Sequence, residues 1–181
     1  MENYPIKMKI KSQRYDVEGS LFSKLLAENE DGDIDLDLSE FDPSECDSEA
    51  IELSTEGVLT LDERRVELSY EESQLTGMEG SRTSVSFEPQ QEGLVTMTRD
   101  GSVSTTLVFE QGRRHHCVYN TPIMPFEVCV RTLKVENNIL REGTLKLDYI
   151  IEIRGAQAER TKFELLVVDN REVSRKNENT L

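Results

Sequence analysis

Apolar and polar residues alternate along most of the chain with a period of two, which is typical of strands that bury one face. In residues 6–11, Ile6, Met8 and Ile10 alternate with lysines. The same alternation recurs down the chain and predicts about ten strands. They cover residues 6–11, 51–61, 64–76, 83–88, 94–99, 103–109, 113–120, 124–135, 145–154 and 163–167.

Turn residues separate these strands at short intervals. The dipeptide Asp100-Gly101 is a strong hairpin signal, and Gln111-Gly112 and Thr121-Pro122 mark two further turns. No segment of helical length lies between the strands, so parallel crossovers are excluded and the sheet is antiparallel. A flat sheet of this size would leave two edges open, which favours closure. Both a barrel and a two-sheet sandwich satisfy this requirement, and the short turns favour an up-and-down barrel of about 8–10 strands.

The pattern predicts one domain over residues 1–169. At most one short helix is expected, over residues 20–28, where Leu21, Phe22, Leu25 and Leu26 share a face. Residues 170–181 have no apolar face and are predicted to form a polar tail.

The charge is concentrated in one segment. The formal net charge is −15, and residues 28–49 hold eleven acidic residues with no Lys or Arg. We expect a solvated insertion loop, within which Ile34, Leu36 and Leu38 alternate as in a short edge strand. The run from Asp31 resembles a calcium loop but has Leu36 where the turn requires glycine, so an EF-hand is not expected and weak binding of divalent cations stays open.

Composition excludes several classes of protein. An acidic domain repels a phosphate backbone, so no nucleic-acid partner is expected. No run of 18 apolar residues is present, so no membrane span is expected. The N-terminus lacks the apolar region of a secretory signal, and Cys46, Cys117 and Cys129 form no CxxC pair. These features predict a cytoplasmic protein with reduced thiols.

The concentrated reactive side chains are His115, His116 and Cys117. Alternation places His115 and Cys117 on one face, about 6.5–7 Å apart along the strand, which is too far for a direct hydrogen bond. Spacings typical of structural zinc sites are missing. The adjacent Glu71 and Glu72 point to opposite faces and cannot act jointly. We therefore predict no catalytic residue, no metal site, no cofactor and no enzymatic activity.

Four stretches of sequence carry a resemblance to a known family. They are LSYEESQLTGMEGSRTSVSFE (68–88), VTMTRDGSVSTTLVFEQGRRHH (95–116), YNTP (119–122) and LKLDYIIEI (145–153). Together they resemble the YwiB-like bacterial proteins, a domain-of-unknown-function family with a calycin-type, lipocalin-like β-barrel. The resemblance covers roughly residues 50–168, with residues 5–16 as the first strand and 28–49 as an insertion. It implies a fold and no catalytic residue.

The predicted inward face suggests a binding site. The residues expected to line the lumen and contact a ligand are Tyr70, Phe87, Phe109, Cys117, Tyr119, Phe126 and Tyr149. Such a lumen suits a small apolar or amphipathic molecule, whose carboxylate Arg99, Arg114 or Arg131 could meet. The same side chains could instead fill the lumen as a plain core. The alternative function is a protein-interaction module that uses the acidic segment 28–49 against a basic partner.

Overall fold

The structure, a computed structural model, describes residues 1–16, 48–76, 80–153 and 157–169. The strands are β1 (Glu2–Asp16), β2 (Ser48–Leu61), β3 (Val66–Glu71), β4 (Arg82–Glu88), β5 (Gln91–Asp100), β6 (Thr105–Glu110), β7 (Arg114–Tyr119), β8 (Phe126–Asn138), β9 (Thr144–Ile153) and β10 (Gln157–Asp169). A short 3₁₀ turn, η2 (Gln74–Thr76), and a four-residue helix, α2 (Ile139–Glu142), complete the described part. The predicted all-β, antiparallel fold with little helix is confirmed.

Three sequence-based predictions fall outside the described residues. They are the helix over 20–28, the edge strand within the acidic segment, and the polar tail at 170–181. Of the acidic segment itself only Ser48 and Glu49 are described, at the start of β2. The hypothesis that this segment binds a basic partner therefore stays a prediction.

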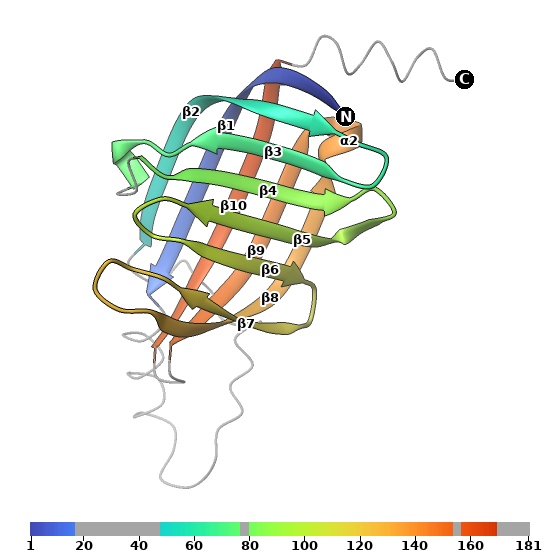
Figure 1. The fold of residues 1–181 in the computed structure, drawn as a ribbon. Coiled ribbons are helices and arrows are strands. Elements are labelled where there is room, and N and C mark those ends of the chain that lie inside the picture. Colours follow the sequence, from blue (N-terminus) through green and yellow to red (C-terminus); the bar gives the residue numbers. More distant parts are fainter. Residues whose placement is uncertain (17–47, 77–79, 154–156, 170–181) are drawn as a thin grey trace, which may run out of the picture.

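The ten strands form one antiparallel sheet that curls into a nearly closed barrel. Their order is β6-β5-β4-β3-β2-β1-β10-β9-β8-β7, so the first and last strands of the chain pair with each other. In Figure 1 the long strands β1, β10, β9 and β8 run steeply behind β3–β6, which cross the front at a large angle. The seam lies between β6 and β7. A single bridge joins its two sides, where the amide N–H groups of Ser104 and Asn120 each donate to the other's carbonyl.

Gly57 marks the place where β2 changes partners. β2 pairs with β1 along its whole length but with β3 only from Gly57 onward. A Cβ atom at Gly57 would lie 2.4 Å from the backbone oxygen of Ser69 and 2.4 Å from Cε of Met8. The close approach of three strands therefore requires glycine at this position.

We expect Gly57→Ala to lower the free energy of unfolding by about 1–3 kcal/mol, because the backbone carbonyl of Ser69 cannot move away without disturbing the sheet. Urea denaturation followed by circular dichroism measures the change. Gly93→Ala is the matched control, since a Cβ there meets nothing within 4 Å. Equal stability of the two variants would contradict the steric argument.

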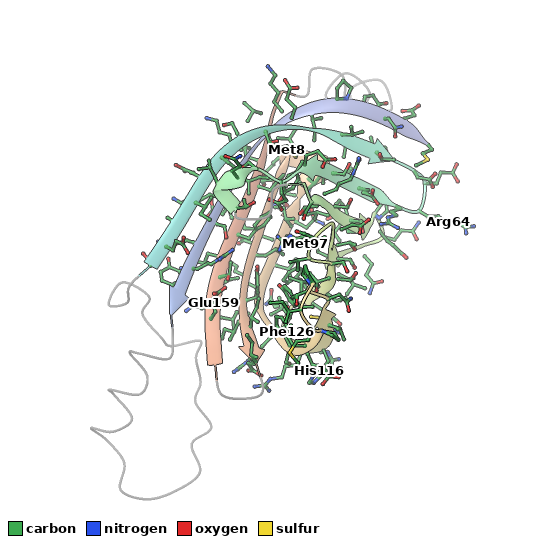
Figure 2. The ribbon with its side chains drawn as sticks, turned by 60° about the vertical axis from the view of Figure 1, so that its left-hand side comes forward. Met8, Arg64, Met97, His116, Phe126 and Glu159 are labelled. Atoms are coloured by element: carbon green, nitrogen blue, oxygen red, sulfur yellow. The ribbon has the colours of Figure 1, made fainter. Side chains whose placement is uncertain are left out.

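The inward rows of side chains change character along the barrel axis. On β1, Ile6, Met8 and Ile10 are buried in the core and are followed by Ser12 and Arg14. On β5, Val95 and Met97 precede Arg99, and on β10, Val167, Leu165 and Phe163 lie beyond Thr161 and Glu159. Figure 2 shows Met8 and Met97 inside the barrel, whereas Arg64 projects outward. On these three strands the inward row is thus apolar at one end and polar at the other, whereas β9 keeps apolar residues at both ends, with Leu145 in the core and Ile153 in the cavity lining.

The apolar end is packed. Phe109 is fully buried there, and Ile139 of α2 belongs to the same core. Gly143 ends α2 in a left-handed conformation (φ 71°) and its carbonyl accepts a hydrogen bond from the amide of Val167 on β10. Side chains therefore fill this half of the barrel, and any hollow must lie toward the other end.

Candidate functional site

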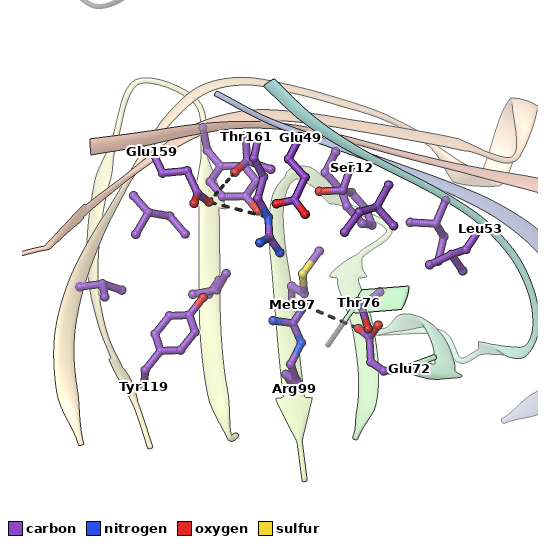
Figure 3. A pocket seen from close by; sticks show the side chains of 18 of the residues that line it. Ser12, Glu49, Leu53, Glu72, Thr76, Met97, Arg99, Tyr119, Glu159 and Thr161 are labelled. Atoms are coloured by element: carbon purple, nitrogen blue, oxygen red, sulfur yellow. Dashed lines mark hydrogen bonds and ion pairs between the residues drawn. The ribbon is translucent and has the colours of Figure 1, made fainter. Parts of the chain in front are cut away.

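A cavity of about 690 Å³ occupies the polar half of the barrel. Its mouth includes Arg14 near the end of β1 and Ser48 and Glu49 at the start of β2. Figure 3 shows Ser12, Glu49, Glu159 and Thr161 on one wall, facing Glu72, Arg99 and Tyr119 on the other. The walls come from strands at both ends of the sheet, so only the curled sheet forms this space.

Apolar side chains form the deeper part of the cavity. They come from the same inward rows that supply the core: Ile10, Leu53, Met97, Leu107 and Phe163. Met97, Leu107 and Phe163 are themselves buried, so they border both the packed half and the hollow half. The cavity therefore has an apolar floor against the core, and closer to the mouth polar groups lie alongside the apolar side chains of Ile51, Phe126 and Ile153.

Arg99 is the charged group at the centre of the site. Its side chain is 16 % exposed, and its Nη2 atom lies 3.5 Å from Oε1 of Glu72, whose side chain is 2 % exposed. Arg99 Nε donates to Oγ1 of Thr83 at 3.4 Å, and the Thr83 hydroxyl donates to Oε1 of Glu72. Contacts with two partners, Thr83 and the buried Glu72, therefore hold the partly buried guanidinium in one orientation.

Three tyrosines surround this arginine. Burial raises the pKa of Tyr70, Tyr119 and Tyr149, and the positive charge of Arg99 partly offsets the rise in each case. All three hydroxyls therefore stay protonated at neutral pH. The Tyr119 ring stacks on Phe126 with centroids 5.4 Å apart and planes 13° apart, which fixes its direction. The site thus presents neutral hydroxyl groups beside one guanidinium.

Acidic and basic groups also meet at the mouth. Arg14 Nε lies 3.9 Å from Oε1 of Glu159, and the same oxygen accepts a hydrogen bond from Thr161 at 3.3 Å. Glu49 is exposed at the start of β2. Among the described lining residues the charged ones are two arginines and three glutamates. The lining therefore carries one negative charge in excess.

The structure separates the seven residues predicted to contact a ligand into two groups. Tyr70, Tyr119, Phe126 and Tyr149 line the cavity. Phe87 and Phe109 lie in the packed core, and Cys117 is half-buried outside the lining. All seven lie on inward rows as alternation predicted, but the cavity occupies only part of the lumen.

Burial raises the pKa of the Cys117 thiol, which is therefore protonated at neutral pH. Its neighbour His115 contacts Oε2 of Glu110 at 3.3 Å, and His116 faces Cys129 across the β7–β8 ladder. Within the described ranges, no three His, Cys, Asp or Glu side chains gather closely enough to hold a metal ion.

Only one of the three arginines considered for the lumen enters the cavity. Arg99 does so, whereas Arg114 pairs with Glu152 at 3.4 Å and is exposed. Arg131 lies opposite Arg114 in the β7–β8 ladder and is not part of the lining. The inward rows supply the signal that distinguishes them, since Arg99 shares a face with Val95 and Met97.

Sequence reasoning missed Glu72, Glu159 and Thr161 as lining residues. Glu72 and Glu71 point to opposite faces as expected, with Glu71 near Arg82 outside and Glu72 inside. Glu159 and Thr161 lie on β10, which begins at Gln157, whereas the predicted strand began at residue 163. The available signal was the spacing: both continue the inward row of Phe163 and Leu165 by steps of two.

Comparisons with known proteins show which solved structure has a similar fold. The described helices include none long and apolar enough to cross a membrane. A comparison with curated proteins finds no match. The crystal structure of the ywiB protein from Bacillus subtilis is similar, with a TM-score of 0.59, 18 % sequence identity, and coverage of 92 % of this chain and 94 % of that chain. At this identity the likeness shows a shared fold.

A family profile described as "Domain of unknown function (DUF1934)" matches residues 38–165. The matched segment includes β2–β9 and most of β10. It also begins within the acidic segment that the sequence analysis treated as an insertion. Because the match covers well over half of the chain, the protein belongs to the DUF1934 family.

Proposed function

We propose that this barrel binds a small amphipathic molecule in its lumen and does so without catalysis. The observation that carries the proposal is the cavity of about 690 Å³ with an apolar floor and a partly buried arginine on its wall. Ligand pockets are typically about 300–1,000 Å³, mostly apolar, with a few fixed polar groups. The volume of this cavity lies in that range, and its lining combines apolar side chains with an arginine that two partners hold in place.

The gradient of polarity along the barrel orients the ligand. Its apolar part is expected to lie against Met97, Leu107 and Phe163, where burial of about 25 cal/mol per Å² provides the affinity. Its polar end is expected near Arg99 and Tyr119, which lie closer to the mouth. The reverse orientation would place apolar atoms on the buried Arg99–Glu72 pair and leave its polar groups without partners.

The chemistry of the lining supports binding rather than turnover. The described lining residues include no His, Cys or Lys, and the three tyrosine hydroxyls are held protonated. Nucleophilic catalysis needs a nucleophile hydrogen-bonded to a base. The Glu72 oxygen that accepts from Thr83 also lies 3.5 Å from Nη2 of Arg99, with which it forms an ion pair.

A neutral fluorescent probe, 1-aminoanthracene, tests the proposal directly. We expect saturable binding by the purified protein, and Ile51→Trp to weaken it at least tenfold because the indole ring fills space that the cavity now holds. The matched control is Ile123→Trp, since Ile123 is 92 % exposed and distant from the lining. Absence of saturable binding, or equal affinity of the Ile51→Trp variant and the wild type, would contradict the proposal.

A further inference from the structure

We infer that the polar end of the ligand is an uncharged group that presents a hydrogen-bond acceptor beside a donor, as a carboxamide or a lactam does, and is not a free carboxylate. This inference rests on the proposed function, because it specifies the ligand class of the same cavity. Three independent observations support it: the arrangement of Arg99 and Glu72, the charge of the lining, and the Tyr119 hydroxyl.

The Arg99–Glu72 pair presents a donor beside an acceptor. The Thr83 hydroxyl accepts a hydrogen bond from Nε of Arg99 and donates one to Oε1 of Glu72. Neither Nη1 of Arg99 nor Oε2 of Glu72 has a hydrogen-bond partner among the described residues. A carboxamide can accept from the guanidinium through its oxygen and donate to the carboxylate through its nitrogen, and so satisfy both groups at once.

A carboxylate would not satisfy both groups. It could accept from Arg99, but it would then lie beside the carboxylate of Glu72, whose side chain is 2 % exposed. Two like charges in a poorly solvated site repel strongly, and neither can donate a hydrogen bond to the other. Arg99 is already neutralised by Glu72, so a second anion gains little from the guanidinium.

The charges of the whole cavity lining also disfavour an anionic ligand. The described lining has three glutamates against two arginines. A negative field at an opening disfavours anions. A cationic ammonium head avoids this repulsion, but it has no lone pair to accept a hydrogen bond from Arg99 or Tyr119, so an uncharged head fits best.

Tyr119 supplies a further donor. Burial keeps its hydroxyl protonated, and the hydroxyl points into the cavity with no hydrogen-bond partner among the described residues (Figure 3). Phe126 holds the ring in place by stacking. A carbonyl oxygen has two lone pairs and can accept from Arg99 and Tyr119 together. The described polar groups therefore provide two donors for one carbonyl and one acceptor for its neighbouring N–H.

The test compares three probes with one alkyl chain: decanamide, decanoate and decylamine, each displacing 1-aminoanthracene from the full-length protein at pH 7.5. We expect decanamide to bind at least tenfold more tightly than either charged analogue. Equal or tighter binding of decanoate or decylamine overturns the inference and leaves the proposed function standing. Failure of all three to displace bound 1-aminoanthracene also overturns it. If 1-aminoanthracene itself does not bind, the proposed function fails and the inference with it.

Two matched variants test which residue causes the preference for decanamide over decanoate. Glu72→Gln removes the carboxylate beside Arg99, and we expect the preference for decanamide over decanoate to fall at least fivefold. Glu49→Gln removes the same charge at the exposed mouth, away from Arg99, and should leave most of that preference intact. Equal effects of the two variants would contradict the assignment to the Arg99–Glu72 pair. The wild-type ranking decides the ligand class even if Glu72→Gln folds poorly.

Discussion

Phe109→Ala is expected to lower the free energy of unfolding by about 3–5 kcal/mol, the range for removing a large aromatic side chain from a packed core. Phe109 is fully buried on β6. The centroid of its ring lies 4.7 Å from the ring centroid of Tyr149, and the two ring planes make an angle of 57°. The substitution removes apolar contact and leaves a void that the surrounding strands can only partly close. Urea denaturation monitored by tyrosine fluorescence measures the loss.

Phe126→Ala is the matched control for this effect. Phe126 is the same residue type but lines the hollow half of the barrel, where it is only partly buried and stacks on Tyr119. We expect a loss of about 1–2 kcal/mol, because fewer packed atoms lose contact and no closed void forms. Equal losses for the two variants would show that the barrel is not divided into a packed half and a hollow half.

Asp148→Ala is expected to lower the free energy of unfolding by about 1–3 kcal/mol, because it removes the two charge-assisted hydrogen bonds that Asp148 accepts from the largely buried guanidinium of Arg160. Arg160 donates from Nε to Oδ1 of Asp148 at 2.9 Å and from Nη2 to Oδ2 at 2.8 Å. The two side chains are 9 % and 19 % exposed. The two parallel hydrogen bonds also join β9 to β10, where Arg160 and Asp148 lie near one another in the ladder.

The control for this pair is Glu136→Ala, which removes the partner of Lys134 on the barrel surface. Both of those side chains are exposed, and such pairs contribute little to stability. Urea denaturation of both variants at low and at high salt separates the two cases. A loss for Asp148→Ala no larger than that for Glu136→Ala would show that these two hydrogen bonds contribute little to stability.

Local pattern was sufficient to predict most strands. Residues 83–88, for example, were expected as a strand and form β4 from Arg82 to Glu88. Turn residues were equally informative, since Asp100-Gly101 separates β5 from β6. These features depend on neighbours in the sequence, where side-chain alternation and turn chemistry act directly.

Strand ends were predicted less well because they depend on distant partners. β1 continues to Asp16, as the family resemblance implied but five residues beyond the end that alternation predicted, since β2 and β10 pair with it on both sides. The third predicted strand instead stops at Glu71, and η2 follows over Gln74–Thr76. Pairing with neighbouring strands thus extends a strand beyond the residues in which apolar and polar side chains alternate.

The cavity could be predicted only in part, for the same reason. Alternation identifies the inward residues, yet Phe109 and Phe126 both face inward and only one borders empty space. The difference is their height along the barrel axis, which the registers of all ten strands set together. Glu72 and Arg99 also meet because they lie at a similar height in the barrel. No spacing within a single strand indicates this contact.

The pairing of β1 with β10 has a consequence for how the protein is made. On a ribosome, β1 emerges first and can pair with β2, but its other edge has no native neighbour until the final strand has left the exit tunnel. The nascent sheet therefore carries an open edge until β10 has been made, and such edges attract other chains. Closure of this barrel waits for β10, and we expect chaperones able to shield the β1 edge to assist it.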